Sequence, residues 1–146
     1  QRGLAALAEA ERLNTRADTD PGPYQLQAAI AACHGRAATA DATDWPRIAA
    51  LYGELLAIQP SPVVALNRAV AVAMADGPAV GLALVDALQG EPALRQYQWL
   101  PSVRGDLLAK LGRAAEARAE FERAAELAGN ERERALLLER ARALLG

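Results

Sequence analysis

One strip of polar and aromatic side chains holds most of the chemistry that this sequence could perform. Tyr24, Gln27 and His34 recur at spacings of three and seven residues, so in a helix they share one face. A phenol, an amide and an imidazole in line can form either a buried polar network or a strip that recognises a ligand. His34 is the single histidine and has no second ligand-type residue at metal spacing, which favours a structural role over metal binding or acid–base catalysis.

A second polar pair, Asn67 and Arg68, interrupts an otherwise apolar run that extends from Val63 to Ala75. Polar groups in such surroundings need partners. Two interpretations stay open: the pair ties down neighbouring turns or helix ends, or it faces a groove and binds a peptide or a carboxylate.

The remaining inventory argues against an enzyme. The sequence contains no nucleophile with a spaced base, no glycine-rich phosphate loop and no constellation of paired carboxylates. We therefore expect no catalytic residues, no metal and no cofactor. Cys33 is the single cysteine, cannot form an internal disulfide, and is interpreted as a small buried hydrophobe of a cytoplasmic protein.

Composition narrows the class of protein and of partner. The 146 residues are 52% hydrophobic, and 16 Lys and Arg stand against 18 Asp and Glu, for a net charge of −2. This predicts one soluble domain, residues 1–146, that neither spans a membrane nor binds nucleic acid directly. Because the chain begins with Gln1 rather than Met, we expect a fragment of a longer protein.

The elements that must position these residues are predicted to be helices. Alanine and leucine dominate, aromatic residues make up 4%, and proline- or glycine-containing turns recur at helix-length intervals. The predicted helices span residues 3–16, 22–39, 44–59, 62–75, 78–90, 93–111, 113–128 and 130–145.

These helices follow a repeat that resembles the tetratricopeptide repeat (TPR), which is about 34 residues long. Predicted turns at Thr43, Gly77 and Gly112 are 34 and 35 residues apart, and Ala117 and Phe121 match the small-x-x-x-aromatic pair of such repeats. The prediction is an all-α, right-handed stack of antiparallel helix pairs, a TPR-like α-α superhelix of about eight helices; a plain antiparallel bundle is the alternative. In this frame Trp99 and Ser102 fall at positions that line the concave side.

Five longer strings resemble the C-terminal extension of one group of extracytoplasmic-function (ECF) bacterial sigma factors. The strings occupy residues 22–34, 44–52, 60–73, 100–113 and 117–130. The resemblance implies a regulatory TPR-like domain behind DNA- and polymerase-binding regions that this chain lacks. It also implies protein partners: the sigma regions of the same chain, the RNA polymerase holoenzyme, and a DGPF/YCII-like protein.

The leading hypothesis is thus a cytoplasmic protein-interaction and regulatory domain that modulates transcription initiation; the alternatives are a small-molecule sensor and a structural oligomerisation module. The candidates for partner binding or for a polar network are Tyr24, Gln25, Gln27, His34, Asn67, Arg68, Trp99 and Ser102. The candidates for structural roles are Gly22, Pro23, Trp45, Tyr52, Pro60, Gly77, Gly112, Ala117 and Phe121.

Overall fold

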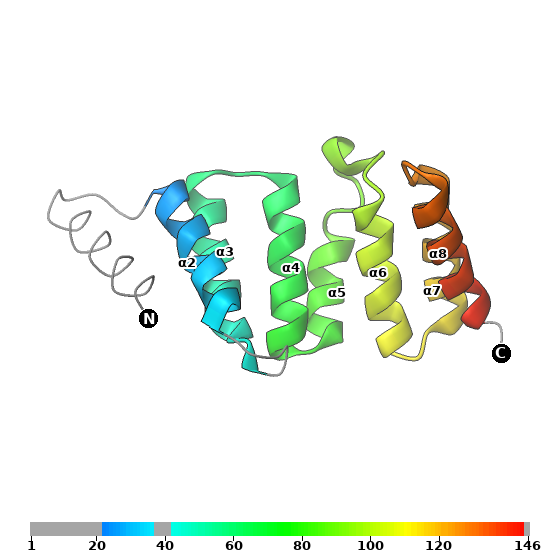
Figure 1. Ribbon diagram of the computed structural model, residues 1–146, viewed down its shortest axis with the longest axis horizontal. Coiled ribbons are helices and arrows are strands. Elements are labelled where there is room, and N and C mark those ends of the chain that lie inside the picture. Colours follow the sequence, from blue (N-terminus) through cyan, green and yellow to red (C-terminus); the bar gives the residue numbers. More distant parts are fainter. Residues whose placement is uncertain (1–21, 37–41, 145–146) are drawn as a thin grey trace, which may run out of the picture. The chain divides into compact units, whose positions relative to one another are not determined.

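The computed structural model describes residues 22–36 and 42–144, and the described part of the chain is helical with no strand (Figure 1). None of its helices is long and apolar enough to cross a membrane. The α-helices are α2 (Pro23–Arg36), α3 (Trp45–Ile58), α4 (Pro62–Asp76), α5 (Pro78–Asp86), α6 (Trp99–Lys110), α7 (Ala114–Leu127) and α8 (Glu131–Ala143). The chain divides into two compact units, Gln1–Ala71 and Val72–Gly146, with the boundary inside α4.

The core of the first unit lies between α2 and α3. On α2 the buried positions Leu26, Ile30 and Cys33 recur every three or four residues, as an amphipathic helix requires. They pack against Ile48, Leu51 and Leu55 of α3 and against Ala71 of α4, with Trp45 and Tyr52 half-buried at the edge of this cluster.

The starts of α2, α3 and α4 follow local rules. Pro23 and Pro62 are first residues of their helices, where the missing N–H costs nothing. Asp44 caps α3 by accepting a hydrogen bond from the Arg47 N–H at 3.2 Å. Gly22 precedes α2, and its carbonyl accepts the first bond of that helix, from the Leu26 N–H; Pro60 is exposed between α3 and α4.

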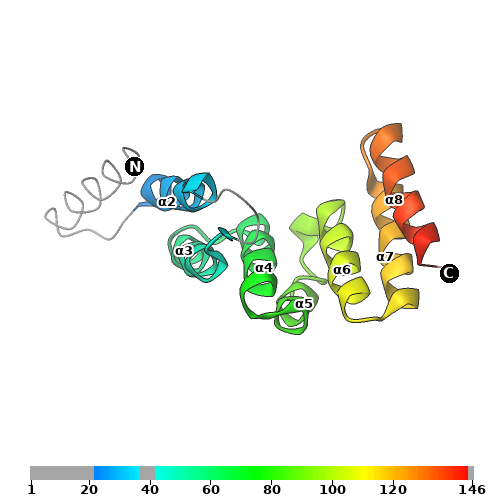
Figure 2. The same cartoon turned by 60° about the horizontal axis from the view of Figure 1, so that its bottom comes forward.

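In the second unit, tight turns join consecutive helices into antiparallel pairs. Gly77, between α4 and α5, has φ 107°, and Gly112, between α6 and α7, has φ 79°. Both lie in the left-handed region that a glycine adopts without strain. Asn130 caps α8, its side-chain oxygen accepting from the Glu133 N–H at 2.8 Å. Figure 2 shows α7 and α8 side by side.

The tightest packing in this unit brings α6 and α7 together. A Cβ atom built on Gly105 of α6 would lie 2.8 Å from the ring of Phe121 on α7, closer than such atoms approach in proteins. Phe121 is 2% exposed, and Ala117 and Ala124, one turn to either side, are fully buried. The missing side chain of Gly105 therefore makes room for the Phe121 ring.

Two predicted helix boundaries are wrong, and a proline explains the larger error. The predicted helix 93–111 begins only at Trp99, after a short 3-10 helix at Pro92–Leu94. A helix from residue 93 would place Pro101 in its interior, where it lacks an N–H and clashes with the carbonyl of Tyr97. The predicted helix 78–90 ends at Asp86 and continues as turns whose N–H groups bond three residues back, such as Leu88 to Val85. The predicted helix 3–16 and residues 37–39 lie outside the described residues.

The close contact between Gly105 and the Phe121 ring predicts that adding a side chain at position 105 lowers the free energy of unfolding. Gly105→Ala should lose about 1–3 kcal/mol through overpacking against the ring and regain up to about 1 kcal/mol through helix propensity. We expect a net loss of about 1–2 kcal/mol in the free energy of unfolding, measured by urea titration with circular dichroism.

Gly35→Ala is the matched control. Gly35 also lies in a helix, but a Cβ built there meets nothing within 4 Å, so this variant should be neutral or more stable. If Gly105→Ala is as stable as Gly35→Ala, the close approach of Gly105 to the Phe121 ring does not contribute to the free energy of unfolding, and the prediction is wrong.

Candidate functional site

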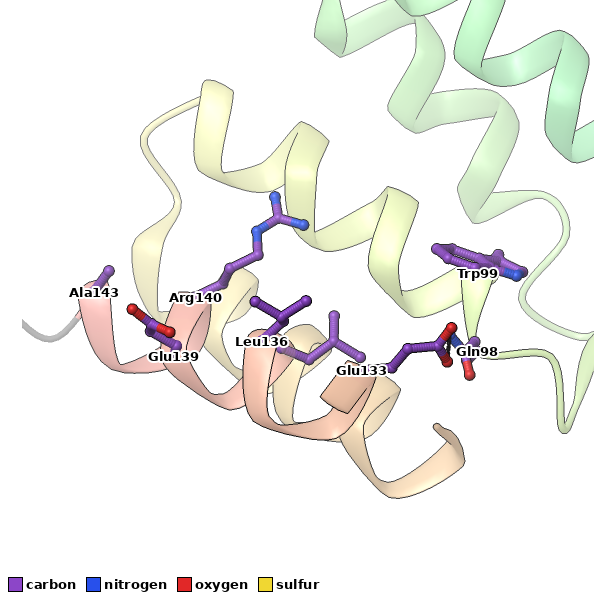
Figure 3. Close-up of a pocket in the computed structure, with 8 residues that line it drawn as sticks. Gln98, Trp99, Glu133, Leu136, Glu139, Arg140 and Ala143 are labelled. Atoms are coloured by element: carbon purple, nitrogen blue, oxygen red, sulfur yellow. Dashed lines mark hydrogen bonds between the residues drawn. The ribbon is translucent and has the colours of Figure 1, made fainter. Parts of the chain in front are cut away.

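The second unit contains an open apolar groove of about 550 Å³ between the start of α6 and the length of α8 (Figure 3). Two large apolar side chains stand in it largely uncovered: Trp99 is 49% exposed and Leu136 is 54% exposed. The residues that line the groove are Gln98, Trp99, Glu133, Leu136, Leu137, Glu139, Arg140 and Ala143. We call it the α6–α8 groove.

Gln98 fixes one end of the α6–α8 groove. Its amide nitrogen donates to Glu133 Oε2 at 3.0 Å, and its amide oxygen accepts from the Gly129 N–H at 3.2 Å. One side chain thus ties the residue before α6 to the α7–α8 turn and to the first turn of α8. Trp99 follows directly, so this tie also holds the indole at the edge of the groove.

Arg140 of α8 lines the α6–α8 groove at the end away from Gln98. Its guanidinium forms an ion pair with Asp106 of α6 and lies over the ring of Phe121, 4.3 Å from the ring centroid. A planar guanidinium can make both contacts at once, whereas an ammonium group would favour one. The positive charge of Arg140 is therefore directed at α6 and α7.

Behind the groove, Arg104 links α5, α6 and α7. Its guanidinium lies 2.8 Å from Asp86 and 3.4 Å from Glu120. Burial acts to lower the pKa of Arg104, but the hydrogen bond to Asp86 and the charges of Glu120 and Asp86 outweigh it and raise that pKa. Burial raises the pKa of Glu120 despite the opposing charge of Arg104, and Glu120 Oε2 has no hydrogen-bond partner among the described residues.

A neighbouring carboxyl on α7 behaves in the opposite way. Glu116 is exposed, and the hydrogen bond from Arg113, 2.6 Å away, lowers its pKa, while the same bond raises the pKa of Arg113.

Burial raises the pKa of the Tyr52 phenol in the first unit. Within the described residues no group of three or more His, Cys, Asp or Glu side chains could hold a metal ion.

The sequence-predicted strip on α2 is an exposed face of the first unit. Tyr24 is 83% exposed, Gln27 and His34 are also exposed, and Gln25 is half-buried. The His34 imidazole meets the Trp45 indole edge to face, with ring centroids 5.6 Å apart. His34 thus belongs to an aromatic contact between α2 and α3, while Tyr24 and Gln27 remain open to solvent.

The other candidates lie on α4 and α6. Asn67 is exposed and Arg68 is half-buried, with its Nε 3.7 Å from the position of a Cβ on Gly53, so the side chain rests against α3. Ser102 is 5% exposed, and its hydroxyl has no hydrogen-bond partner among the described residues. Trp99 lines the α6–α8 groove, whereas the α2 and α4 candidates do not.

Sequence reasoning missed most of the groove, although α8 carries a signal for it. Glu133, Leu136, Leu137 and Arg140 recur at the three- and four-residue spacing of one helix face. The sequence does not indicate that the start of α6 lies opposite this face, because the contact joins residues about 35 positions apart.

Comparison with known proteins supports the fold. No protein-family model matches the chain. Over 117 residues, 80% of the chain, it is 54% identical to Uncharacterized protein R00370 of Rhizobium meliloti (strain 1021), of whose length it spans 27%. Among solved structures it is similar to the first TPR domain of human RPAP3, with a TM-score of 0.64 and 22% identity over 85% of this chain and 94% of that one.

A second similar structure is the first TPR of Spaghetti (RPAP3) bound to the HSP90 peptide SRMEEVD. Its TM-score is 0.55 and its identity 27%, over 69% of this chain and 79% of that one. The chain has a TPR-like fold. The predicted all-α architecture of TPR-like helix pairs is therefore confirmed, while the sigma-factor relationship stays a prediction.

The contacts of Arg140 predict a stabilising role. Arg140→Gln removes an exposed ion pair, worth about 0.2–1 kcal/mol, and a cation–π contact of similar size, so we expect a loss of about 1 kcal/mol in unfolding free energy. Arg142→Gln is the control, since Arg142 shares the last turn of α8 but is not paired with Asp106. Equal losses in the two variants would contradict a specific role of the Asp106 and Phe121 contacts.

Glu120 and Glu116 should titrate in opposite directions from an ordinary glutamate, measured by carboxyl NMR shifts against pH. Because the folded-state pKa of Glu120 is raised, its contribution to stability falls as pH rises from the unfolded to the folded pKa. Relative to the parent, Glu120→Gln should therefore become more stable as pH rises above the ordinary glutamate pKa of about 4.3, whereas Glu116→Gln should become less stable as pH rises toward that value from below. A Glu120 midpoint below that of Glu116 would contradict this prediction.

Proposed function

We propose that this chain is a protein-interaction module that binds a segment of a partner protein in the α6–α8 groove. The observation that carries the proposal is the pair of half-exposed anchors, Trp99 and Leu136, facing one open apolar groove. A few large apolar side chains that a partner covers contribute most of the binding free energy in protein interfaces.

The polar ties of Gln98 and Arg140 support this proposal. Gln98, the residue before α6, bonds Glu133 of α8, and Arg140 of α8 pairs with Asp106 of α6, so the two walls are held in place before any partner arrives. A pre-formed groove lowers the conformational cost of binding. The Spaghetti structure supports it further, because a TPR of similar fold is there bound to a peptide.

The arrangement favours binding over catalysis. The titratable groups with shifted pKa values near α6, Arg104 and Glu120, are engaged with each other and with Asp86. They do not line the α6–α8 groove. We accordingly propose no catalytic residue and no cofactor.

The finer proposal is that this module is the regulatory part of an ECF-type sigma factor acting in the cytoplasm. It rests on the resemblance of residues 22–34, 44–52 and 60–73 to that family's C-terminal extension. The match to a relative of which this chain spans 27% supports a place within a longer protein. The partners would be the sigma regions, RNA polymerase holoenzyme or a DGPF/YCII-like protein.

The test uses the longer protein that contains this chain, together with core RNA polymerase, in transcription from its target promoter. Removing the domain should change transcript yield severalfold, and Trp99→Ala with Leu136→Ala should reproduce that change, because both remove the anchors. Val80→Ala is the control, since Val80 is similarly exposed on α5 but lies outside the groove.

Two results would sink parts of the proposal separately. Failure of the longer protein to bind core polymerase would overturn the sigma-factor assignment. An effect of domain removal that the anchor variants do not reproduce would overturn the α6–α8 groove as the regulatory surface.

A further inference from the structure

The charges that line the α6–α8 groove are not balanced. Glu133 accepts a hydrogen bond from Gln98, a neutral amide, so its negative charge is oriented but not cancelled. Glu139 is exposed and has no ion-pair partner among the described residues. Two carboxylates therefore lie along the α8 wall beside the apolar anchors (Figure 3).

The one cation in the lining does not offset them. The guanidinium of Arg140 pairs with Asp106, which is not a lining residue, and rests on the Phe121 ring. In Figure 3 this side chain extends from α8 toward α6, away from Glu139. Arg140 is itself half exposed, and the other exposed arginines of α8, Arg132 and Arg142, are outside the lining.

From this imbalance we infer the chemistry of the occupant: a partner segment in which large apolar side chains stand next to lysine or arginine. The inference rests on the proposed function of the α6–α8 groove and adds its charge selectivity. The apolar side chains would cover Trp99 and Leu136, and the cationic side chains would approach Glu133 and Glu139. Such pairs at a partly exposed rim act mainly on selectivity and association rate.

This preference is opposite to that of an acidic ligand. The peptide bound to the Spaghetti TPR, SRMEEVD, contains three acidic residues and one arginine. Placed against Glu133 and Glu139, its carboxylates would meet like charges, which costs binding free energy. Similarity of fold therefore does not carry the peptide preference to this chain.

The test compares two short amidated peptides on the whole chain. In one, a pair of leucines is flanked by lysines; in the other, glutamates replace the lysines. Binding is followed by calorimetry and by the change in tryptophan emission, to which Trp99 in the groove and Trp45 in the first unit both contribute. At low salt we expect the lysine peptide to bind about fivefold or more tightly, with the ratio shrinking at high salt as the charges are screened.

Charge variants of the chain locate the preference. Glu133→Gln with Glu139→Gln should bring the two peptides to within about twofold of each other. Glu54→Gln with Glu122→Gln changes the net charge equally at exposed positions outside the groove and should leave the ratio intact. Equal effects of the two double variants would overturn the inference, since the preference would then reflect only overall charge.

The remaining outcomes separate this inference from the proposed function. If both peptides bind equally and Trp99→Ala weakens both, the groove binds peptides and the charge inference fails. If neither peptide binds, or if Trp99→Ala has no effect, the groove itself fails as a binding site. Self-association in light scattering that Leu136→Ala abolishes would show a second copy as the occupant and would overturn the inference of a basic segment.

Discussion

The distance between α6 and α7 depends on a glycine that faces an aromatic ring. Because Gly105 has no side chain, the Phe121 ring enters the space between the helices, where a Cβ would lie 2.8 Å from it. The contact also sets up its neighbours. The next residue on α6 is Asp106, and the guanidinium that covers the Phe121 ring, that of Arg140, pairs with it. Gly105 thus sets how closely α7 packs on α6. The Phe121 ring held there contacts the Arg140 guanidinium of α8, and Arg140 lines one end of the groove.

The other end depends on where α6 begins. Pro101 is tolerated in the first turn of a helix and disfavoured further in, so the helix starts at Trp99 and leaves Gln98 as the residue before it. In that position the Gln98 amide reaches both Gly129 and Glu133. A helix continuing from residue 93 would give Gln98 an interior position in α6. The proline therefore contributes to the groove although it does not line it.

The sequence predicted what depends on local rules. The turns at Gly77 and Gly112 were placed by glycine spacing, and both glycines have the positive φ that only such a residue adopts readily. The caps at Asp44 and Asn130 are of the residue types that favour that position, so they too follow a local rule. The errors arose where two local signals competed, as at residues 93–111, where apolar periodicity favoured a helix and Pro101 excluded it. The groove escaped prediction because its ties, Gln98 to Glu133 and Arg140 to Asp106, join positions 34 or 35 residues apart, and periodicity within one helix carries no information on which faces meet.

The negative charge of the α6–α8 groove depends on where the nearby arginines of the second unit form their ion pairs. Arg104 and Arg140 are each held by carboxylates of other helices, so their charges serve packing within the second unit. A guanidinium is suited to this because it can stack on a ring and bond a carboxylate at the same time. Among the described residues Glu133 and Glu139 of α8 form no ion pair, and the Glu133 carboxylate accepts a hydrogen bond from the Gln98 amide. Two arginines, Arg104 and Arg140, thus pair with carboxylates between helices, while Glu133 and Glu139 have no ion-pair partner among the described residues and line the groove with Trp99 and Leu136. Apolar area and charge then act on different properties of one surface, the first on affinity and the second on the choice of partner.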